Sequence, residues 1–202
     1  PGLVLTALYM GYVFLVSIFR PTWVPALPPE ARTLGSGIGS LLVALIVWVV
    51  GLAVPVTASY IMCAVIAAPA LIKLGIPDYA AHMFIFYYAV LSEVSPPTAL
   101  APFAAATITR ADPYVTTLQS WKYALPAFLV PFIFVLDPIG SGLLLEFPKG
   151  MTWGWAVWVT IGAAFGVLAL AFAAQGHITR PLGVAARVVC FAAGVSLMFP
   201  DL

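Results

Sequence analysis

Charged residues divide the chain into long apolar segments, and these segments predict the helices. Residues 33–72 form a run of 40 residues without a charge. One helix of that length would reach about 60 Å, roughly twice the hydrocarbon thickness of a bilayer. Glycine and proline both weaken a helix, so we expect a break between Gly51 and Pro55. Helices are then predicted near 34–50 and 58–72.

A second interruption is predicted around Glu93. Two short apolar arms, 79–92 and 99–109, flank the sequence Glu93-Val-Ser-Pro-Pro-Thr98. Adjacent prolines remove two backbone donors and prevent a regular helix. This pattern predicts a re-entrant hairpin or a broken helix. At membrane depth such a backbone must be buried in protein or line a wet cavity.

The remaining segments predict a mixture of loops and membrane spans, without the alternation that strands require. Loops are expected at 20–33 and 138–150, a short interfacial segment at 114–120, and spans at 121–137, 151–175 and 184–199. Three tryptophans open the span at 151–175 and mark a membrane interface. The pattern therefore predicts an all-α integral membrane protein, a transmembrane helix bundle with interrupted helices.

Composition agrees with a multi-pass protein of the cell membrane. The 202 residues are 63% hydrophobic and 7% charged, whereas soluble domains carry about 25% charged residues. Mean hydropathy is +1.11. A net charge of +1 offers no basic surface, so no nucleic-acid partner is expected. No His-Glu-x-x-His or Gly-x-Ser-x-Gly motif occurs. We therefore expect neither an enzyme nor a cofactor other than a coupling ion.

Basic residues predict the orientation. If 121–137, 151–175 and 184–199 each cross once, then Arg110, Lys122, Arg180 and Arg187 share one side and Lys149 lies opposite. Cytoplasmic loops are enriched in Lys and Arg. The side with four basic residues is therefore predicted to be cytoplasmic.

The two interruptions resemble each other and form the candidate site. In each, a proline is followed by threonine and alanine within an apolar stretch. Unwinding frees carbonyls that can bind Na⁺ together with hydroxyls, and helix N-termini that can face an anionic solute. Simple proline kinks are the alternative interpretation. The candidate ion- and substrate-binding residues are Gly51, Pro55, Thr57, Ser59, Ser92, Glu93, Ser95, Pro96, Pro97 and Thr98, with sodium expected at Thr57, Ser95 and Thr98.

Glu93 is the most specific single candidate, because an ionisable group within a membrane segment is costly to bury. Its carboxylate could complete a sodium site or carry a proton. Alternatively, it lies in a water-filled vestibule and is merely solvated. His82 follows Asp78 and Tyr79 closely and is expected near an interface.

The stretch from Pro77 to Leu100, PDYAAHMFIFYYAVLSEVSPPTAL, resembles the permease of the tripartite ATP-independent periplasmic (TRAP) transporters. The likeness covers essentially the whole chain. It is greatest to the fused-permease branch that works with TAXI-type binding proteins, because Ala111-Asp-Pro113, Trp121-Lys-Tyr123 and the ending near Arg180 are also similar. Family versions of the first break are often richer in glycine than Gly51-Leu-Ala-Val-Pro-Val-Thr57.

The resemblance implies an elevator-type membrane subunit that imports an organic, carboxylate-type solute. A sodium gradient drives it, and an extracytoplasmic binding protein delivers the solute to the face opposite Arg110 and Arg180. We expect the chain to be the C-terminal portion of such a permease, with small-subunit-like helices on a missing N-terminal part. Residues 1–137 are then the C-terminal half of the transport unit, and 138–202 are extra transmembrane helices. The alternatives are a proton-coupled transporter that uses Glu93 and a non-transporting structural subunit.

Overall fold

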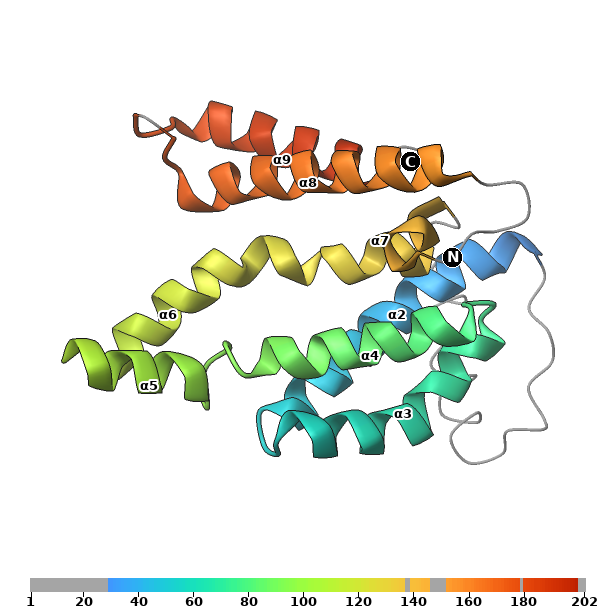
Figure 1. Cartoon of the computed structure of the whole chain (residues 1–202), viewed down its shortest axis with the longest axis horizontal. Helices are drawn as coiled ribbons and strands as arrows, with labels where there is room; N and C mark the ends of the chain where they lie inside the picture. The colour runs from blue at the N-terminus through green and yellow to red at the C-terminus, as the bar shows by residue number, and fades with distance from the viewer. Residues whose placement is uncertain (1–28, 137–138, 146–151, 179, 200–202) are drawn as a thin grey trace, which may run out of the picture. The chain divides into compact units, whose positions relative to one another are not determined.

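The computed structural model describes residues 29–136, 139–145, 152–178 and 180–199 (Figure 1). Within these ranges the regular elements are helices, and a single isolated β-bridge joins His177 and Pro181. The predicted all-α fold is thereby confirmed. The chain divides into two compact units between Glu93 and Val94, and each unit is described by itself. The functional division at residues 137 and 138 stays a prediction.

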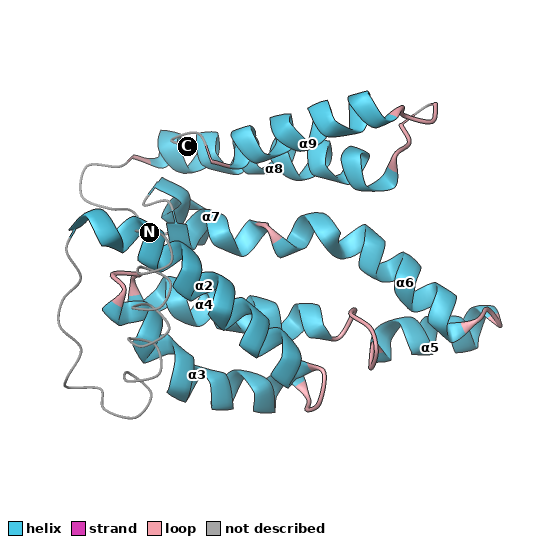
Figure 2. Cartoon of the chain, turned by 180° about the vertical axis from the view of Figure 1, so that it is seen from behind, coloured by secondary structure: helices cyan, strands magenta, loops and turns pink. Residues whose placement is uncertain are grey.

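From residue 29 onward, the first unit consists of the helices α2 (Pro29–Gly51), α3 (Val56–Lys73) and α4 (Asp78–Ser92). Helix α4 packs against both α2 and α3 (Figure 2). Its buried core includes Val43 and Val47 of α2, Leu71 of α3, and Phe84 and Ile85 of α4. Burial of these apolar side chains in one layer between three helices is the main source of stability of the unit.

Helix α2 begins earlier than the sequence predicts. Residues 29–33 were expected in a loop but form the first turns of α2, whereas residues 20–28 lie outside the described residues. Proline at the first helical position is well tolerated, because the N–H that it lacks has no partner there. Pro29 therefore marks the start of α2.

The second unit contains a helical hairpin, a segment with two bends, and a pair of long helices. The elements are α5 (Leu100–Thr109), α6 (Pro113–Ala124), the 3₁₀ helix η1 (Leu125–Phe128), α7 (Val130–Leu136), the 3₁₀ helix η2 (Ile139–Leu144), α8 (Trp153–Gln175) and α9 (Val184–Met198). Helices α8 and α9 lie side by side in both views (Figures 1 and 2). Ile133 of α7 packs with Leu170 of α8 and Met198 of α9 in one buried cluster.

Two expectations for the second unit were wrong. Residues 114–120 are not a separate segment but part of α6, which also contains Lys122. The side chain of Asp112 accepts a hydrogen bond from the backbone N–H of Val115 (2.9 Å), and Pro113 occupies the first turn. Both are strong helix-start signals. The predicted loop at 138–150 contains η2, and Lys149 lies outside the described residues.

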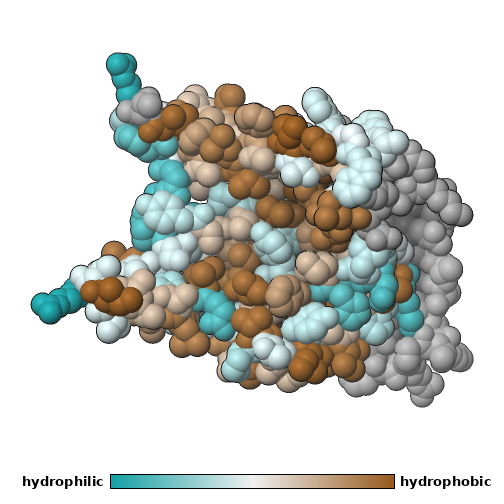
Figure 3. Space-filling model, viewed as in Figure 1, coloured by the Kyte–Doolittle hydropathy of each residue, from teal (hydrophilic) through white to brown (hydrophobic). Residues whose placement is uncertain are grey.

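Among the described residues, three helical stretches are long and apolar enough to cross a membrane: Val56–Lys73, Pro113–Leu136 and Trp153–Gln175. The described parts of α2 and α9 are apolar but shorter, and the 15 residues of α9 reach about 22 Å at the usual rise per residue. Hydrophobic side chains cover much of the surface visible in Figure 3. In water such a surface would drive aggregation, whereas in a bilayer it faces the acyl chains.

Candidate ion and solute site at the helix interruptions

The first interruption is a short turn between α2 and α3. The N–H of Ala53 donates to the carbonyl of Val50 (3.0 Å), and Pro55 supplies no donor and precedes α3. The buried hydroxyl of Ser59 donates back into this turn, to the carbonyls of Val54 (3.1 Å) and Pro55 (3.2 Å). One side chain from the first turn of α3 therefore holds the carbonyls of the break in place.

Gly51 brings the end of α2 against the end of α4. A Cβ atom built on Gly51 would overlap the hydroxyl oxygen of Ser92 and would lie 2.7 Å from its Cβ. No side chain fits in that space, so glycine is needed here for close approach and not for its backbone angles. Ser92 is buried and donates its own hydroxyl to the carbonyl of Ala89 (2.6 Å).

This contact joins the C-terminal ends of two helices. The last carbonyls of a helix have no partner within it and carry about half a negative charge in sum. Glu93, which is half-buried, is the next residue after Ser92 in the chain. Two helix C-termini and one hydroxyl oxygen therefore meet at the Gly51–Ser92 contact, with a carboxylate one residue away in sequence. Such an arrangement favours a cation.

The second interruption extends from Glu93 into the second unit. Its turn is closed by a hydrogen bond from the N–H of Ala99 to the carbonyl of Ser95 (3.1 Å), and the peptide bond between Pro96 and Pro97 is cis. Ser95 is buried, whereas Pro97 and Thr98 are exposed. The helix is thus fully interrupted here, and α5 begins only at Leu100.

The structure brings together some of the predicted site residues. Gly51 and Ser92 are in contact in the first unit, and Glu93 follows Ser92 in the chain. Ser59 is buried in the first turn of α3, shortly after Gly51 in sequence. Pro55 and Thr57 are exposed, so they contribute no shielded oxygen. Ser95, Pro96, Pro97 and Thr98 belong to the second unit. Of the three residues expected to bind sodium, Thr57, Ser95 and Thr98, the first therefore lies in one unit and the other two in the other.

The sequence analysis missed a polar connection between α3 and α4. The hydroxyl of Tyr60 lies 3.1 Å from Nδ1 of His82, and Nε2 of the same ring lies 3.5 Å from a carboxylate oxygen of Asp78. The ring of Tyr60 also meets Phe86 edge-to-face, with centroids 5.8 Å apart. The spacing of four residues between Asp78 and His82 was visible in the sequence. The contact with Tyr60, 22 positions away, was not.

These features define a helical membrane protein whose helices are interrupted by polar turns. The profile of the family described as "Tripartite ATP-independent periplasmic transporter, DctM component" matches residues 31–138, which is more than half of the chain. The chain therefore belongs to the DctM family of TRAP permeases. Searches of curated proteins and of solved structures found no match.

The matched part contains both interruptions and ends before η2, so α8 and α9 lie beyond it. Membership identifies the chain with the membrane permease of a secondary transporter and not with an enzyme family. Permeases of this family act with an extracytoplasmic binding protein and a substrate. The interrupted helices are the part of the chain where such a permease is expected to bind ions and solute.

Proposed function

We propose that this chain forms part of a sodium-driven permease of the TAXI-associated, fused branch. It imports an organic solute of the carboxylate type that an extracytoplasmic binding protein delivers. In this proposal the chain lies in the inner membrane, and the sodium ion binds beside the Gly51–Ser92 contact. The solute binds where the interruptions expose backbone amides.

The meeting of two helix C-termini at Gly51 and Ser92 is the observation that carries the proposal. Sodium prefers several oxygen ligands, and neutral carbonyl and hydroxyl oxygens suffice where the backbone is unwound. The helix ends supply carbonyls with a partial negative charge, and the lone pairs of the Ser92 hydroxyl remain available although its hydrogen is donated to Ala89. Glu93 adds a full charge next to them.

The interruptions also provide helix N-termini, whose partial charge is positive and therefore opposite to that of the helix C-termini. Helices α3 and α5 begin at Val56 and Leu100, directly after the two breaks. Their first backbone N–H groups have no partner within the helix and attract anions. Neither helix has a side-chain cap on these groups. A carboxylate is therefore the solute class that the N-terminus of either helix would attract, while the C-termini of α2 and α4 hold the coupling ion.

Binding of radioactive sodium to the purified permease tests the ion without knowledge of the solute. We expect saturable binding that Ser92→Ala weakens several-fold. The matched control is Ser196→Ala, which removes an exposed hydroxyl from α9. Equal sodium binding by Ser92→Ala and the wild-type permease would contradict the position assigned to the ion.

Uptake of a panel of labelled small carboxylates into proteoliposomes separates sodium coupling from proton coupling. A sodium site beside the Gly51–Ser92 contact keeps part of its activity after Glu93→Gln and loses most after Ser92→Ala, because alanine lacks the hydroxyl oxygen. Ser196→Ala on α9 is again the matched control, since its side chain is exposed. Full uptake driven by a pH gradient in sodium-free buffer would instead make Glu93 a proton carrier.

The orientation is tested by cross-linking to the binding protein. Lys122 and Arg187 lie on helices α6 and α9, so the basic side is defined by Arg110 and Arg180, which lie outside the helices. We expect cross-links from the binding protein to the face opposite these residues. Cross-links to cysteines introduced at Arg110 or Arg180 would reverse the assigned orientation. In the binding and uptake assays above, a chain that binds neither sodium nor solute would be a structural subunit.

A further inference from the structure

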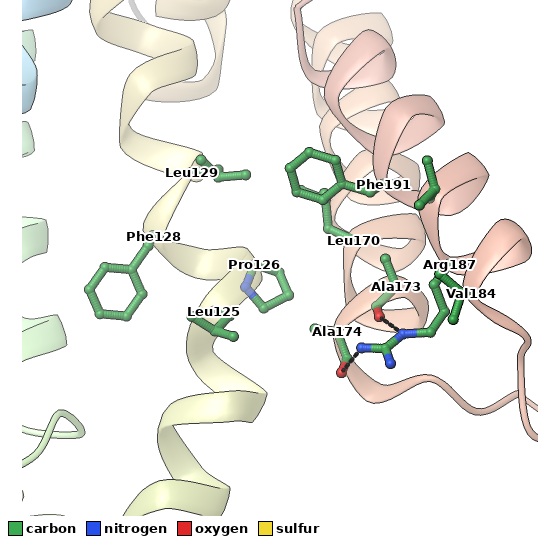
Figure 4. A pocket seen from close by; sticks show the side chains of 11 residues that line it. Leu125, Pro126, Phe128, Leu129, Leu170, Ala173, Ala174, Val184, Arg187 and Phe191 are labelled. Carbon is green, nitrogen blue, oxygen red and sulfur yellow. Dashed lines mark hydrogen bonds between the residues drawn. The ribbon is translucent and has the colours of Figure 1, made fainter.

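An apolar cavity lies within the second unit, between the η1 segment and the pair of α8 and α9. Its volume is about 610 Å³, in the range of sites that bind small organic ligands. The lining residues come from three elements that are distant in sequence (Figure 4). In the figure, Pro126 and Leu129 face the helix pair, from which Leu170 and Phe191 project toward them.

The lining is almost entirely hydrocarbon. Every lining residue except Arg187 is leucine, proline, phenylalanine, alanine or valine. Water in such a cavity would find few hydrogen-bond partners, and it needs two to four to be held in place. An alkyl chain is the occupant that matches these walls. The elements around the cavity include two candidate membrane spans, Pro113–Leu136 and Trp153–Gln175. In a membrane, these spans are surrounded by the acyl chains of lipids.

Arg187 is the one charged group of the cavity, and it is held in a fixed position. Its Nε donates to the carbonyl of Ala173 (2.8 Å) and one terminal nitrogen to that of Ala174 (3.5 Å). These carbonyls belong to the last turn of α8, which ends at Gln175 in a left-handed glycine, Gly176. A guanidinium has five N–H donors in a planar fork, so others remain for an anion.

The position of Arg187 corresponds to the depth of lipid headgroups. The carbonyls that it contacts end the 23-residue candidate span Trp153–Gln175, whose length of about 34 Å matches the hydrocarbon core. The charge of the hairpin has the complementary sign. Between Trp153 and Met198 the sequence contains Arg180, Arg187 and His177 and no acidic residue. Basic pockets between membrane helices attract anionic headgroups.

We propose that this cavity binds an anionic phospholipid, with one acyl chain between η1 and the helix pair and the phosphate at Arg187. The apolar walls select the chain, and the fixed guanidinium selects the phosphate and the negative headgroup. The seven lining residues of α8 and α9, Arg187 among them, lie beyond the residues that match the family. The ion site proposed above lies in the first unit, and the cavity lies within the second. It connects α8 and α9 to the α6–η1–α7 segment through a lipid.

Native mass spectrometry of the purified permease, titrated with phosphatidylglycerol or phosphatidylcholine, tests the proposal. We expect phosphatidylglycerol to bind more tightly, and Arg187→Gln to weaken it about fivefold, the effect of one basic residue near an anionic surface. Arg187→Lys, which keeps the charge, should restore part of the difference. Arg180→Gln is the matched control, because Arg180 is on the same hairpin but does not line the cavity.

A second pair of variants tests the cavity without disturbing the end of α8. Val188 and Val189 are neighbours on α9 and are exposed to 62% and 66%, but only Val188 lines the cavity. Val188→Trp should fill it and reduce binding of phosphatidylglycerol, whereas Val189→Trp should not. Equal binding of both lipids, or equal effects of the two tryptophan variants, would overturn the proposal. The cavity would then contact only the non-specific lipid that surrounds any membrane protein.

Discussion

Two close contacts between helices, both made possible by glycine, differ in what they produce. At the end of α2, Gly51 lies against the hydroxyl of Ser92 at the end of α4. In α8 and α9, Gly166 and Gly194 oppose each other in mid-helix. A Cβ on either would lie 3.0 Å from the carbonyl oxygen of the other. The first contact is polar and the second is surrounded by the apolar side chains of Leu170 and Met198.

The difference teaches that the place of a glycine within its helix decides its role. In mid-helix every backbone group is already hydrogen-bonded, so close approach gains only packing. At a helix end the last carbonyls take their donors from the following turn or from side chains, as Val50 does from the N–H of Ala53 and Ala89 does from the Ser92 hydroxyl. The α8–α9 pair therefore suits a rigid scaffold. The α2–α4 contact suits a site that responds to a bound ion.

The mid-helix contact should give the largest effect on stability. Gly166→Leu introduces a side chain against the carbonyl of Gly194 and the backbone N–H of Met198, which cannot move away without separating the helices. Overpacking of this kind costs about 1–3 kcal/mol and occasionally more. The free energy of unfolding in mixed micelles, followed by circular dichroism, measures it.

Gly154→Leu is the matched control for that variant. It lies on the same helix, and a Cβ there would meet only the hydroxyl of Thr152 at 3.8 Å. The wild-type stability should be retained. If the two variants lose equal stability, the Gly166–Gly194 contact does not hold α8 and α9 together. The contrast drawn between this apolar contact and the polar Gly51–Ser92 contact would then be wrong.

The polar contact should give the next largest effect. Gly51→Ala places a methyl group on the Ser92 side chain, and we expect a loss of about 1–3 kcal/mol. Ser92→Gly in the same chain should recover most of it, because the colliding atoms are removed. A double-mutant cycle on the free energy of unfolding measures the coupling. Purely additive losses would show that the two residues do not touch.

Much of this arrangement could be predicted from the sequence. The 40-residue uncharged run required a break, and Gly51 and Pro55 located it to within a residue or two of the observed helix ends. The adjacent prolines Pro96 and Pro97 located the second break in the same way. Such signals are local, because glycine and proline act on the backbone of their own turn.

What could not be predicted depends on contacts between distant segments. The meeting of Gly51 and Ser92, 41 positions apart, follows from the packing of α2 on α4. The same holds for the contact of Arg187 with the last turn of α8. In the sequence, Arg187 was only one of the basic residues that predicted the orientation. The error at 114–120 had a different origin. Mixed polarity was taken for an interfacial segment, although Asp112 and Pro113 carried a helix-start signal.

The turn beside the polar contact offers a smaller test. Ser59→Ala removes the hydroxyl that donates to the carbonyls of Val54 and Pro55. Because the Ser59 hydroxyl is buried and its acceptors are only partly so, the loss should be about 1 kcal/mol. Ser196→Ala on α9, an exposed position, should be neutral. If Ser59 holds the turn for an ion, sodium affinity should fall in the variant while the stability of the α8–α9 pair is unchanged. A variant with normal sodium affinity would limit Ser59 to a structural role.

The smallest effect is expected where a single side-chain hydrogen bond joins α3 to α4. Tyr60→Phe removes the hydroxyl that meets Nδ1 of His82 but keeps the ring that packs on Phe86. One such half-buried hydrogen bond is worth about 0.5–1 kcal/mol. A cycle with His82→Ala isolates it, since each variant alone also changes packing. A coupling near zero would mean that this hydrogen bond adds nothing to the apolar packing of α3 on α4. A clear coupling would show that the first unit also uses a polar contact between side chains of α3 and α4, in addition to the contact at Gly51 and Ser92.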